Sequence, residues 1–128
     1  MTKKVIIAED FAPLRNAYLF QIELMKEDKI LPADLEVECV ANGESLIEKV
    51  KNEKYLLILT DNDMPPGITG LEAIKKIREF DKDVPIYMIS GSAFQSLKSD
   101  ALKYGATGFI DKGELKTRLE SLLKQYLE

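Results

Sequence analysis

The sequence contains no histidine and only one cysteine, Cys39. Without histidine, the protein cannot use imidazole for acid–base catalysis, for a zinc site or as a phosphohistidine carrier. A single cysteine cannot form an internal disulfide bond or a cysteine-rich metal site, and the alternating apolar residues around Cys39 favour a buried structural thiol. The residue types left to carry chemistry are therefore carboxylates, hydroxyls and amines.

Basic stripes and long hydrophobic runs are absent as well. The formal net charge is -4, and no basic stripe is available to neutralise the phosphates of a nucleic acid. No apolar run approaches the roughly 20 residues that a membrane-spanning helix needs, and the N-terminal residues predict a strand instead of a signal peptide. We therefore expect a cytoplasmic protein that binds neither nucleic acid nor a membrane directly.

Length and composition are those of one folded domain. The chain has 128 residues, of which 45% are apolar and 31% are charged. This length is typical of a single domain, and this composition excludes a disordered chain. We expect a single domain over residues 1–128, with no output domain in this chain.

Short apolar runs alternate with amphipathic stretches along the chain, which predicts five strand–helix units. The predicted strands are Val5–Ala8, Leu35–Val40, Tyr55–Thr60, Ile86–Ile89 and Gly108–Asp111. Four of the helices show apolar faces, formed by Leu14, Ala17, Tyr18, Ile22 and Met25, by Leu46, Ile47 and Val50, by Leu71, Ile74, Ile77 and Phe80, and by Leu115, Leu119, Leu122, Leu123 and Tyr126. The helix before the last strand should run from about Ser92 to Tyr104.

This alternation predicts an α/β fold with a parallel sheet and helices on both faces, because each crossover must return the chain to the same end of the sheet. The run 55–60 is almost continuously apolar, which suits a central strand, whereas residues 35–40 alternate as in an edge strand. Five-stranded doubly wound proteins have the strand order 2-1-3-4-5, and we adopt this order from them. It places the first and third strands side by side.

Polar residues follow four of the five predicted strands. Glu9 and Asp10 come after the first strand, Asp61 after the third, Ser90 after the fourth and Lys112 after the fifth. Ligands of doubly wound folds bind outside the carboxyl ends of the strands, so these side chains should converge on one site.

Three carboxylates held together repel one another unless a cation with oxygen ligands lies among them. Magnesium suits such a site, because it binds through one or two carboxylates, keeps several waters and accepts a phosphate oxygen. A lysine ammonium and a serine hydroxyl nearby suit a phosphoryl group in transfer. The residues therefore predict a Mg²⁺-dependent phosphoryl site.

These residues resemble the receiver family of two-component signalling, which has a flavodoxin-like fold, and the resemblance covers essentially the whole chain. It implies that Asp61, in the segment Asp-Asn-Asp-Met-Pro, accepts a phosphoryl group from the phosphohistidine of a sensor histidine kinase or a histidine phosphotransfer protein. It also implies that Asp10 binds Mg²⁺ directly, that Glu9 acts mainly through water, and that the backbone carbonyl of Asp63 is a further ligand.

The same resemblance assigns a switch. Ser90 matches the hydroxyl that contacts the phosphoryl group, Lys112 the lysine that pairs with a phosphoryl oxygen, and Phe109 the aromatic switch residue. Phosphorylation would then alter the surface formed by the last two helices and the last strand, where a downstream protein would bind noncovalently. A receiver of this kind catalyses only its own phosphorylation and dephosphorylation.

Two departures from the family pattern affect the expected geometry. Four residues separate Pro65 from Gly70 where the family usually has three, so the loop that carries the carbonyl of Asp63 should be reshaped. Gly113 stands after Lys112 where the family usually has proline, so the approach of Lys112 to Asp61 should be looser.

Two other interpretations stay open. Asp61-Asn62-Asp63 also matches the nucleophile motif of haloacid dehalogenase-type phosphatases, although those enzymes carry it after their first strand. A pseudo-receiver that binds partners without being phosphorylated is the second alternative. Taken singly, Asp10 and Asp61 would each more often be helix caps than functional acids.

Overall fold

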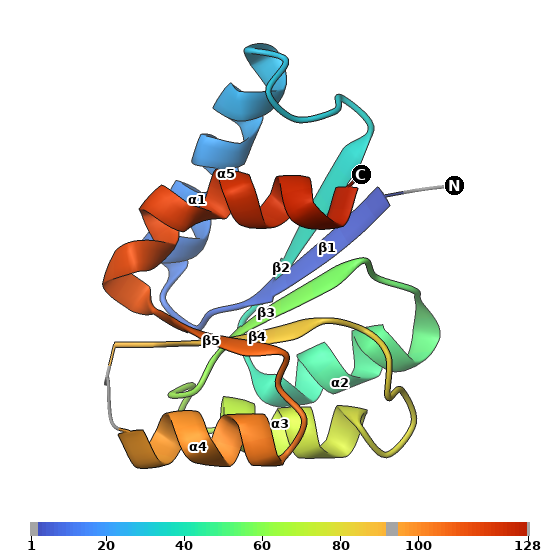
Figure 1. Ribbon diagram of the computed structural model, residues 1–128, viewed down its shortest axis with the longest axis vertical. Coiled ribbons are helices and arrows are strands. Elements are labelled where there is room, and N and C mark those ends of the chain that lie inside the picture. The colour runs from blue at the N-terminus through green and yellow to red at the C-terminus, as the bar shows by residue number, and fades with distance from the viewer. Residues whose placement is uncertain (1–2, 92–94, 128) are drawn as a thin grey trace.

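The computed structural model describes residues 3–91 and 95–127 and contains a five-stranded parallel sheet with the strand order β2-β1-β3-β4-β5 (Figure 1). The strands are β1 (Lys3–Ala8), β2 (Leu35–Val40), β3 (Leu57–Asp61), β4 (Ile86–Ser90) and β5 (Gly108–Asp111). The helices are α1 (Ala12–Glu27), α2 (Gly43–Asn52), α3 (Gly70–Ile77), α4 (Gln95–Lys103) and α5 (Lys112–Leu127). The predicted fold class and strand order are confirmed.

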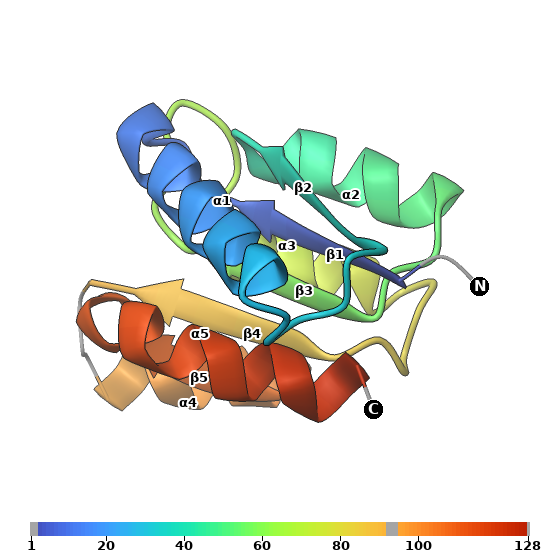
Figure 2. The same cartoon turned by 90° about the horizontal axis from the view of Figure 1, so that it is seen from above.

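Two helix layers cover the sheet. Helices α1 and α5 lie on one face, and α2, α3 and α4 lie on the other (Figures 1 and 2). Along β1, Val5 and Ile7 pack with α1 and α5, whereas Ile6 and Ala8 pack with the other three helices. This alternation follows from the two-residue period of a strand, and it shows why the central strands are apolar on both faces.

Most predicted boundaries agree with the structure, and the differences have local causes. Strand β3 begins at Leu57 and not at Tyr55, and the Tyr55 hydroxyl donates to Glu38 and can donate to Glu53. Ala17 is exposed on α1 and not part of its buried face, and Phe80 is exposed because α3 ends before it, at Ile77. The first three residues of the helix predicted from Ser92 lie outside the described residues.

Cys39 was expected to be buried but is half-buried on the edge strand β2, against the core beneath α1 and α5. Burial nevertheless raises the pKa of its thiol, which keeps the thiolate population low at neutral pH. None of the helices that the structure describes is long and apolar enough to cross a bilayer.

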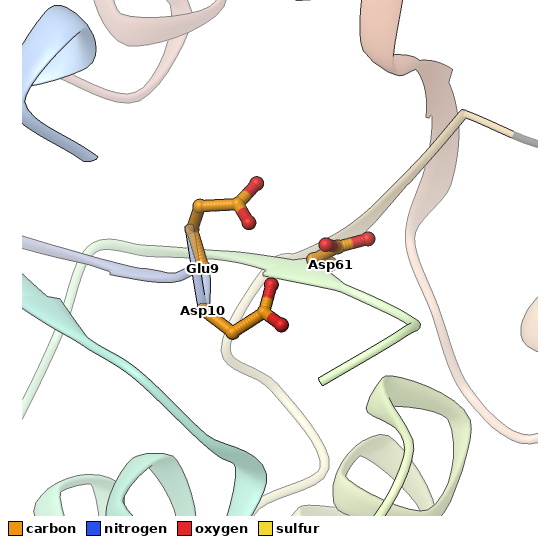
Figure 3. Close-up of side chains that lie close together, drawn as sticks. All are labelled: Glu9, Asp10 and Asp61. Atoms are coloured by element: carbon orange, nitrogen blue, oxygen red, sulfur yellow. The ribbon is translucent and has the colours of Figure 1, made fainter. Parts of the chain in front are cut away.

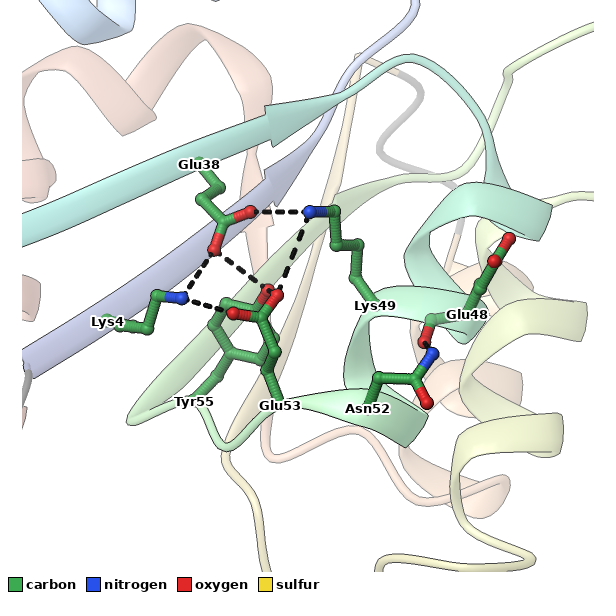
Figure 4. Close-up of polar contacts among 7 residues, drawn as sticks. All are labelled: Lys4, Glu38, Glu48, Lys49, Asn52, Glu53 and Tyr55. Atoms are coloured by element: carbon green, nitrogen blue, oxygen red, sulfur yellow. Dashed lines mark hydrogen bonds and ion pairs between the residues drawn. The ribbon is translucent and has the colours of Figure 1, made fainter.

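A balanced charge cluster ties β1, β2 and α2 together toward the amino ends of the first and third strands (Figure 4). Lys4 pairs with Glu53 and, at 3.1 Å, with Glu38, while Lys49 lies 3.2 Å from Glu38. The Tyr55 hydroxyl donates to Glu38 at 3.0 Å and can also donate to Glu53 at 3.1 Å. Two lysines offset two glutamates here, so this cluster has no excess negative charge that would attract a metal ion.

Candidate phosphoryl and metal site

The carboxyl ends of the strands bring the predicted acids together. β1 and β3 are adjacent parallel strands, so Glu9 and Asp10, which follow β1, lie beside Asp61, the last residue of β3. Carboxylate oxygens of the three residues lie within 4.8 Å of one another (Figure 3). Sequence reasoning therefore placed these three side chains correctly, and the topology explains why they meet.

Lys112 reaches this cluster from the start of α5, directly after β5. Its Nζ lies 2.8 Å from Glu9 Oε1 and donates to Asp61 Oδ2 at 2.9 Å. The looser approach expected from Gly113 is not observed, because the first turn of α5 begins at Lys112 itself and carries its side chain over the sheet edge. Lys112 thus bridges the two buried acids, of which Glu9 is 2% exposed and Asp61 is 4% exposed.

The surroundings of Lys112 and Glu9 shift the pKa values of both side chains. Burial alone would lower the pKa of the Lys112 ammonium, but its hydrogen bonds to Glu9 and Asp61 and their charges raise that pKa above its usual value. Lys112 is therefore a fixed cation at neutral pH. Burial raises the pKa of the Glu9 carboxyl, and the neighbouring charge of Asp61 acts in the same direction, while the hydrogen bond from Lys112 opposes both.

Local hydrogen bonds hold the two buried acids in place. Glu9 Oε2 accepts from the backbone N–H of Phe11 at 3.1 Å, and Arg15 Nη1 donates to the Glu9 carbonyl at 2.7 Å. Asp61 Oδ1 accepts from the N–H of Asn62 at 2.8 Å. Sequence reasoning missed the role of Arg15, because a single arginine on a helix gives no signal of which carbonyl it will bind.

The capping interpretation does not account for these acids. Helix α1 has Phe11 at its N-cap position and no side-chain cap, so Asp10 does not cap it. Helix α3 begins with a capping box formed by Thr69 and Glu72, nine residues after β3 ends, and α2 is capped by Asn42. Asp10 and Asp61 are therefore left for another role at the sheet edge.

The donor set fits a hard divalent cation. Three carboxylates face one ammonium, so the cluster keeps an excess of two negative charges at neutral pH when all four groups are ionised. Oxygens on opposite sides of a magnesium ion are about 4.2 Å apart, twice the usual metal–oxygen distance, so small side-chain movements would close Glu9, Asp10 and Asp61 around it. One carboxylate oxygen of Glu9 already pairs with the Lys112 ammonium, which agrees with an indirect role of Glu9 through water.

The loop after Asp61 is held by residues that the sequence did not single out. Gly70 N–H donates to the Asn62 carbonyl at 2.9 Å, and Leu71 N–H donates to Asn62 Oδ1 at 3.1 Å. A Cβ at Gly70 would collide with the Asp61 carbonyl oxygen, so glycine is required there. Asp63 is exposed, and the role of its backbone carbonyl as a metal ligand stays a prediction.

The two predicted switch residues lie on neighbouring strands. Ser90 is fully buried at the end of β4, next to β3, and pairs in register with Asp111 of β5. Phe109 is half-buried on β5 and packs against the core beneath α2, α3 and α4. Their coupling to Asp61 stays a prediction.

Replacing Asp10 with asparagine should stabilise the metal-free protein by about 1 kcal/mol, because Asp10 adds a like charge beside Glu9 and Asp61 and makes no ion pair within residues 3–91 and 95–127. Urea unfolding in EDTA measures this change. Asp100→Asn, at an exposed position on α4, is the matched control and should change stability little. A variant less stable than the parent would assign Asp10 a structural role.

The same variant should lose much of the stabilisation that magnesium gives the parent. That stabilisation follows RT ln(1 + [L]/Kd) and amounts to about 1.4 kcal/mol at tenfold excess over Kd. Repeating the unfolding curves in millimolar Mg²⁺ separates the two effects. A parent indifferent to magnesium would contradict the assignment of these acids as metal ligands.

Comparison with known proteins agrees with this geometry. Residues 5–124 match the family model of the response regulator receiver domain. The chemotaxis protein CheY of Thermotoga maritima is 32% identical over 126 residues, which cover 98% of this chain and 98% of that protein. CheY of Bacillus subtilis is 32% identical over 113 residues, which cover 88% and 87% of the two chains. The structure of Vibrio cholerae CheY4 superposes with a TM-score of 0.81 at 25% identity, covering 98% and 99%.

Proposed function

Because this chain belongs to the response regulator receiver domain family, we propose that Asp61 is the residue through which it acts as a phosphoacceptor in two-component signalling. One observation carries this assignment: Asp61 ends the central strand with its carboxylate bonded to Lys112 and grouped with Glu9 and Asp10. The phosphodonor would be the phosphohistidine of a sensor histidine kinase or a histidine phosphotransfer protein. A donor that receives its phosphoryl group from ATP implies a cytoplasmic location for this protein.

In the proposed reaction, a carboxylate oxygen of Asp61 attacks phosphorus and the bond between phosphorus and the donor nitrogen breaks, while the leaving nitrogen takes up a proton. Lys112 would hold a phosphoryl oxygen in place of its present bond to Asp61 Oδ2. Asp10, Asp61 and the carbonyl of Asp63 would bind Mg²⁺, with Glu9 acting through water. When bound, the cation offsets negative charge on the phosphoryl oxygens.

The other two interpretations are not favoured. A haloacid dehalogenase-type phosphatase carries its Asp-x-Asp motif after the first strand, whereas Asp61 and Asp63 follow β3. A pseudo-receiver would not need the joint placement of Lys112 with the acids. In the proposed role the chain catalyses only its own phosphorylation and dephosphorylation and turns over no external phosphate ester.

Incubation with phosphoramidate tests the proposal. With Mg²⁺ the intact protein should gain one phosphoryl group, and with EDTA the rate should fall to near zero, because the phosphoryl charge would then meet the uncompensated acids. Steady release of phosphate from a monoester such as p-nitrophenyl phosphate, many times per protein molecule, would instead support the phosphatase.

Phosphorylation should also change the surface formed by α4, β5 and α5, where a downstream protein would bind. The hydroxyl of Ser90 would be drawn toward the phosphoryl group and Phe109 would repack. Amide chemical shifts over residues 92–104 and 108–127, recorded with and without beryllofluoride, test this prediction, and Asp61→Asn is the control. The population change depends on how differently the phosphoryl group interacts with the two states of this surface. We therefore expect a partial change in population. Shift changes confined to the neighbourhood of Asp61 would contradict the switch.

A further inference from the structure

The loop between β3 and α3 is tied to the first turn of α2 by Glu44, an exposed residue that lies outside the phosphoryl site. Glu44 Oε2 accepts a hydrogen bond from the backbone N–H of Ile68 at 3.2 Å. The two residues are 24 positions apart in sequence, so this bond is a tertiary contact and not part of the capping of either helix. The same loop carries the additional residue between Pro65 and Gly70.

Two glycines let the loop approach α2 closely enough for this contact. A Cβ added at Gly67 would lie 2.4 Å from Glu44 Oε1 and 3.0 Å from Glu44 Oε2, so glycine leaves the space that the carboxylate occupies. On the α2 side, a Cβ added at Gly43 would lie 2.6 Å from Ile68 Cγ1. Ile68 also packs against the core beneath α2, α3 and α4. The sequence of both segments therefore suits a close contact between them.

The Glu44 contact fixes one of the two sides of Asp63. On the side toward β3, the backbone carbonyl of Asn62 accepts from the first residue of α3 at 2.9 Å. On the other side, Met64 is buried and its carbonyl accepts at 3.2 Å from the N–H of Gly67, the residue that borders the Glu44 carboxylate. The peptide group of Asp63 lies between these two attachments, so its orientation follows from the path that they impose on the loop.

The second attachment lies in an exposed segment. Pro65, Pro66 and Gly67 are all exposed to solvent. Exposed backbone with few buried contacts opens at a low cost in free energy, so one tertiary hydrogen bond can decide how ordered such a segment is. A loop that is ordered before binding also loses less conformational freedom when it provides a ligand.

We propose that Glu44 is a positioning residue for magnesium binding: it holds the N–H of Ile68 and so keeps the backbone carbonyl of Asp63 in the orientation that serves the cation. This inference rests on the proposed function, in which that carbonyl is a ligand of Mg²⁺. Glu44 itself contacts neither the cation nor the phosphoryl group. Its replacement should therefore lower the affinity for Mg²⁺ and leave the rate of phosphorylation at saturating Mg²⁺ unchanged.

Amide chemical shifts recorded while MgCl₂ is added to the full chain give the dissociation constant of each variant. Glu44→Ala removes the acceptor and should weaken Mg²⁺ binding roughly three- to tenfold. Glu44→Gln removes the charge but keeps an acceptor oxygen at the same reach, and it should stay within about twofold of the parent. Glu48→Ala removes the same charge one turn further along α2, at an exposed position, and is the matched control with an equally small expected change.

Gly67→Ala tests the same contact from the side of the loop. Its methyl group would displace the Glu44 carboxylate, so in the parent it should weaken Mg²⁺ binding by a factor similar to that of Glu44→Ala. In Glu44→Ala the methyl group meets no carboxylate, and adding Gly67→Ala there should have a much smaller effect. Full effects of both substitutions in the double variant would show that they do not act through one contact and would contradict the proposal.

Urea unfolding in EDTA separates positioning from a general loss of stability. The unfolding midpoints of Glu44→Ala and Glu48→Ala should be alike, and a midpoint lowered in Glu44→Ala alone would make the contact merely structural. Unchanged Mg²⁺ affinity in Glu44→Ala, or an equal loss in Glu44→Gln, would overturn the proposal. A parent that takes up no phosphoryl group from phosphoramidate would refute the phosphoacceptor role of Asp61, whereas the metal titrations would still decide the role of Glu44.

Discussion

Replacing Lys112 with methionine should lower the free energy of unfolding of the metal-free protein by about 3 kcal/mol, because it leaves two buried carboxylates without their cation. The Glu9 and Asp61 side chains are 2% and 6% exposed, and Lys112 Nζ lies within 2.9 Å of both. Methionine keeps most of the side-chain volume, so the loss reports the charge and its hydrogen bonds. Urea unfolding in EDTA at neutral pH measures it.

Lys116→Met provides the matched control for this variant. Lys116 is an exposed lysine one turn further along α5, and its replacement changes the net charge by the same amount without touching Glu9 or Asp61. We expect a change within about 0.5 kcal/mol. Magnesium should also stabilise Lys112→Met more than the parent, since the cation then supplies the missing positive charge. Equal stabilities of the two lysine variants would show that the ion pairs contribute little.

The second large effect concerns Asp61. Asp61→Asn should abolish phosphorylation by phosphoramidate, because asparagine offers no carboxylate oxygen to attack phosphorus. Asp63→Asn is the matched control: it removes the same charge two residues away, where the side chain is exposed, and leaves the backbone carbonyl in place. It should still be phosphorylated at a rate within a few-fold of the parent. Intact-mass measurement over time gives both rates. Loss of phosphorylation in both variants alike would mean that the negative charge of this loop, and not a single acceptor residue, controls the reaction.

The fold could be predicted from the sequence because its signals are local and repeated. Continuous apolar runs such as 57–59 indicate buried parallel strands, and the amphipathic run from Leu115 to Leu123 indicates a helix on the sheet. Parallel topology then requires that residues after each strand meet at one edge. For this reason Glu9, Asp10, Asp61 and Lys112, which are distant in sequence, could be grouped before any coordinates were known.

What could not be predicted depends on side-chain packing and on single hydrogen bonds. Arg15 donates to the carbonyl of Glu9, and the close approach of the Asp61 carbonyl requires glycine at Gly70. No sequence pattern indicates either contact. Ala17 belongs to the predicted apolar face of α1 yet is exposed and borders an open groove, which Gly113 of α5 also lines. Helical periodicity identifies the face of a helix, but not which of its residues the neighbouring helix covers.

The most direct test of the central claim locates the phosphoryl group on the chain. After reaction with phosphoramidate and Mg²⁺, borohydride reduces an aspartyl phosphate to homoserine, and peptide mass spectrometry then identifies the modified position. The account predicts one modified position, Asp61, in the magnesium sample and none in the EDTA sample. Homoserine at Asp10 or Asp63, or an unmodified chain in magnesium, would contradict it.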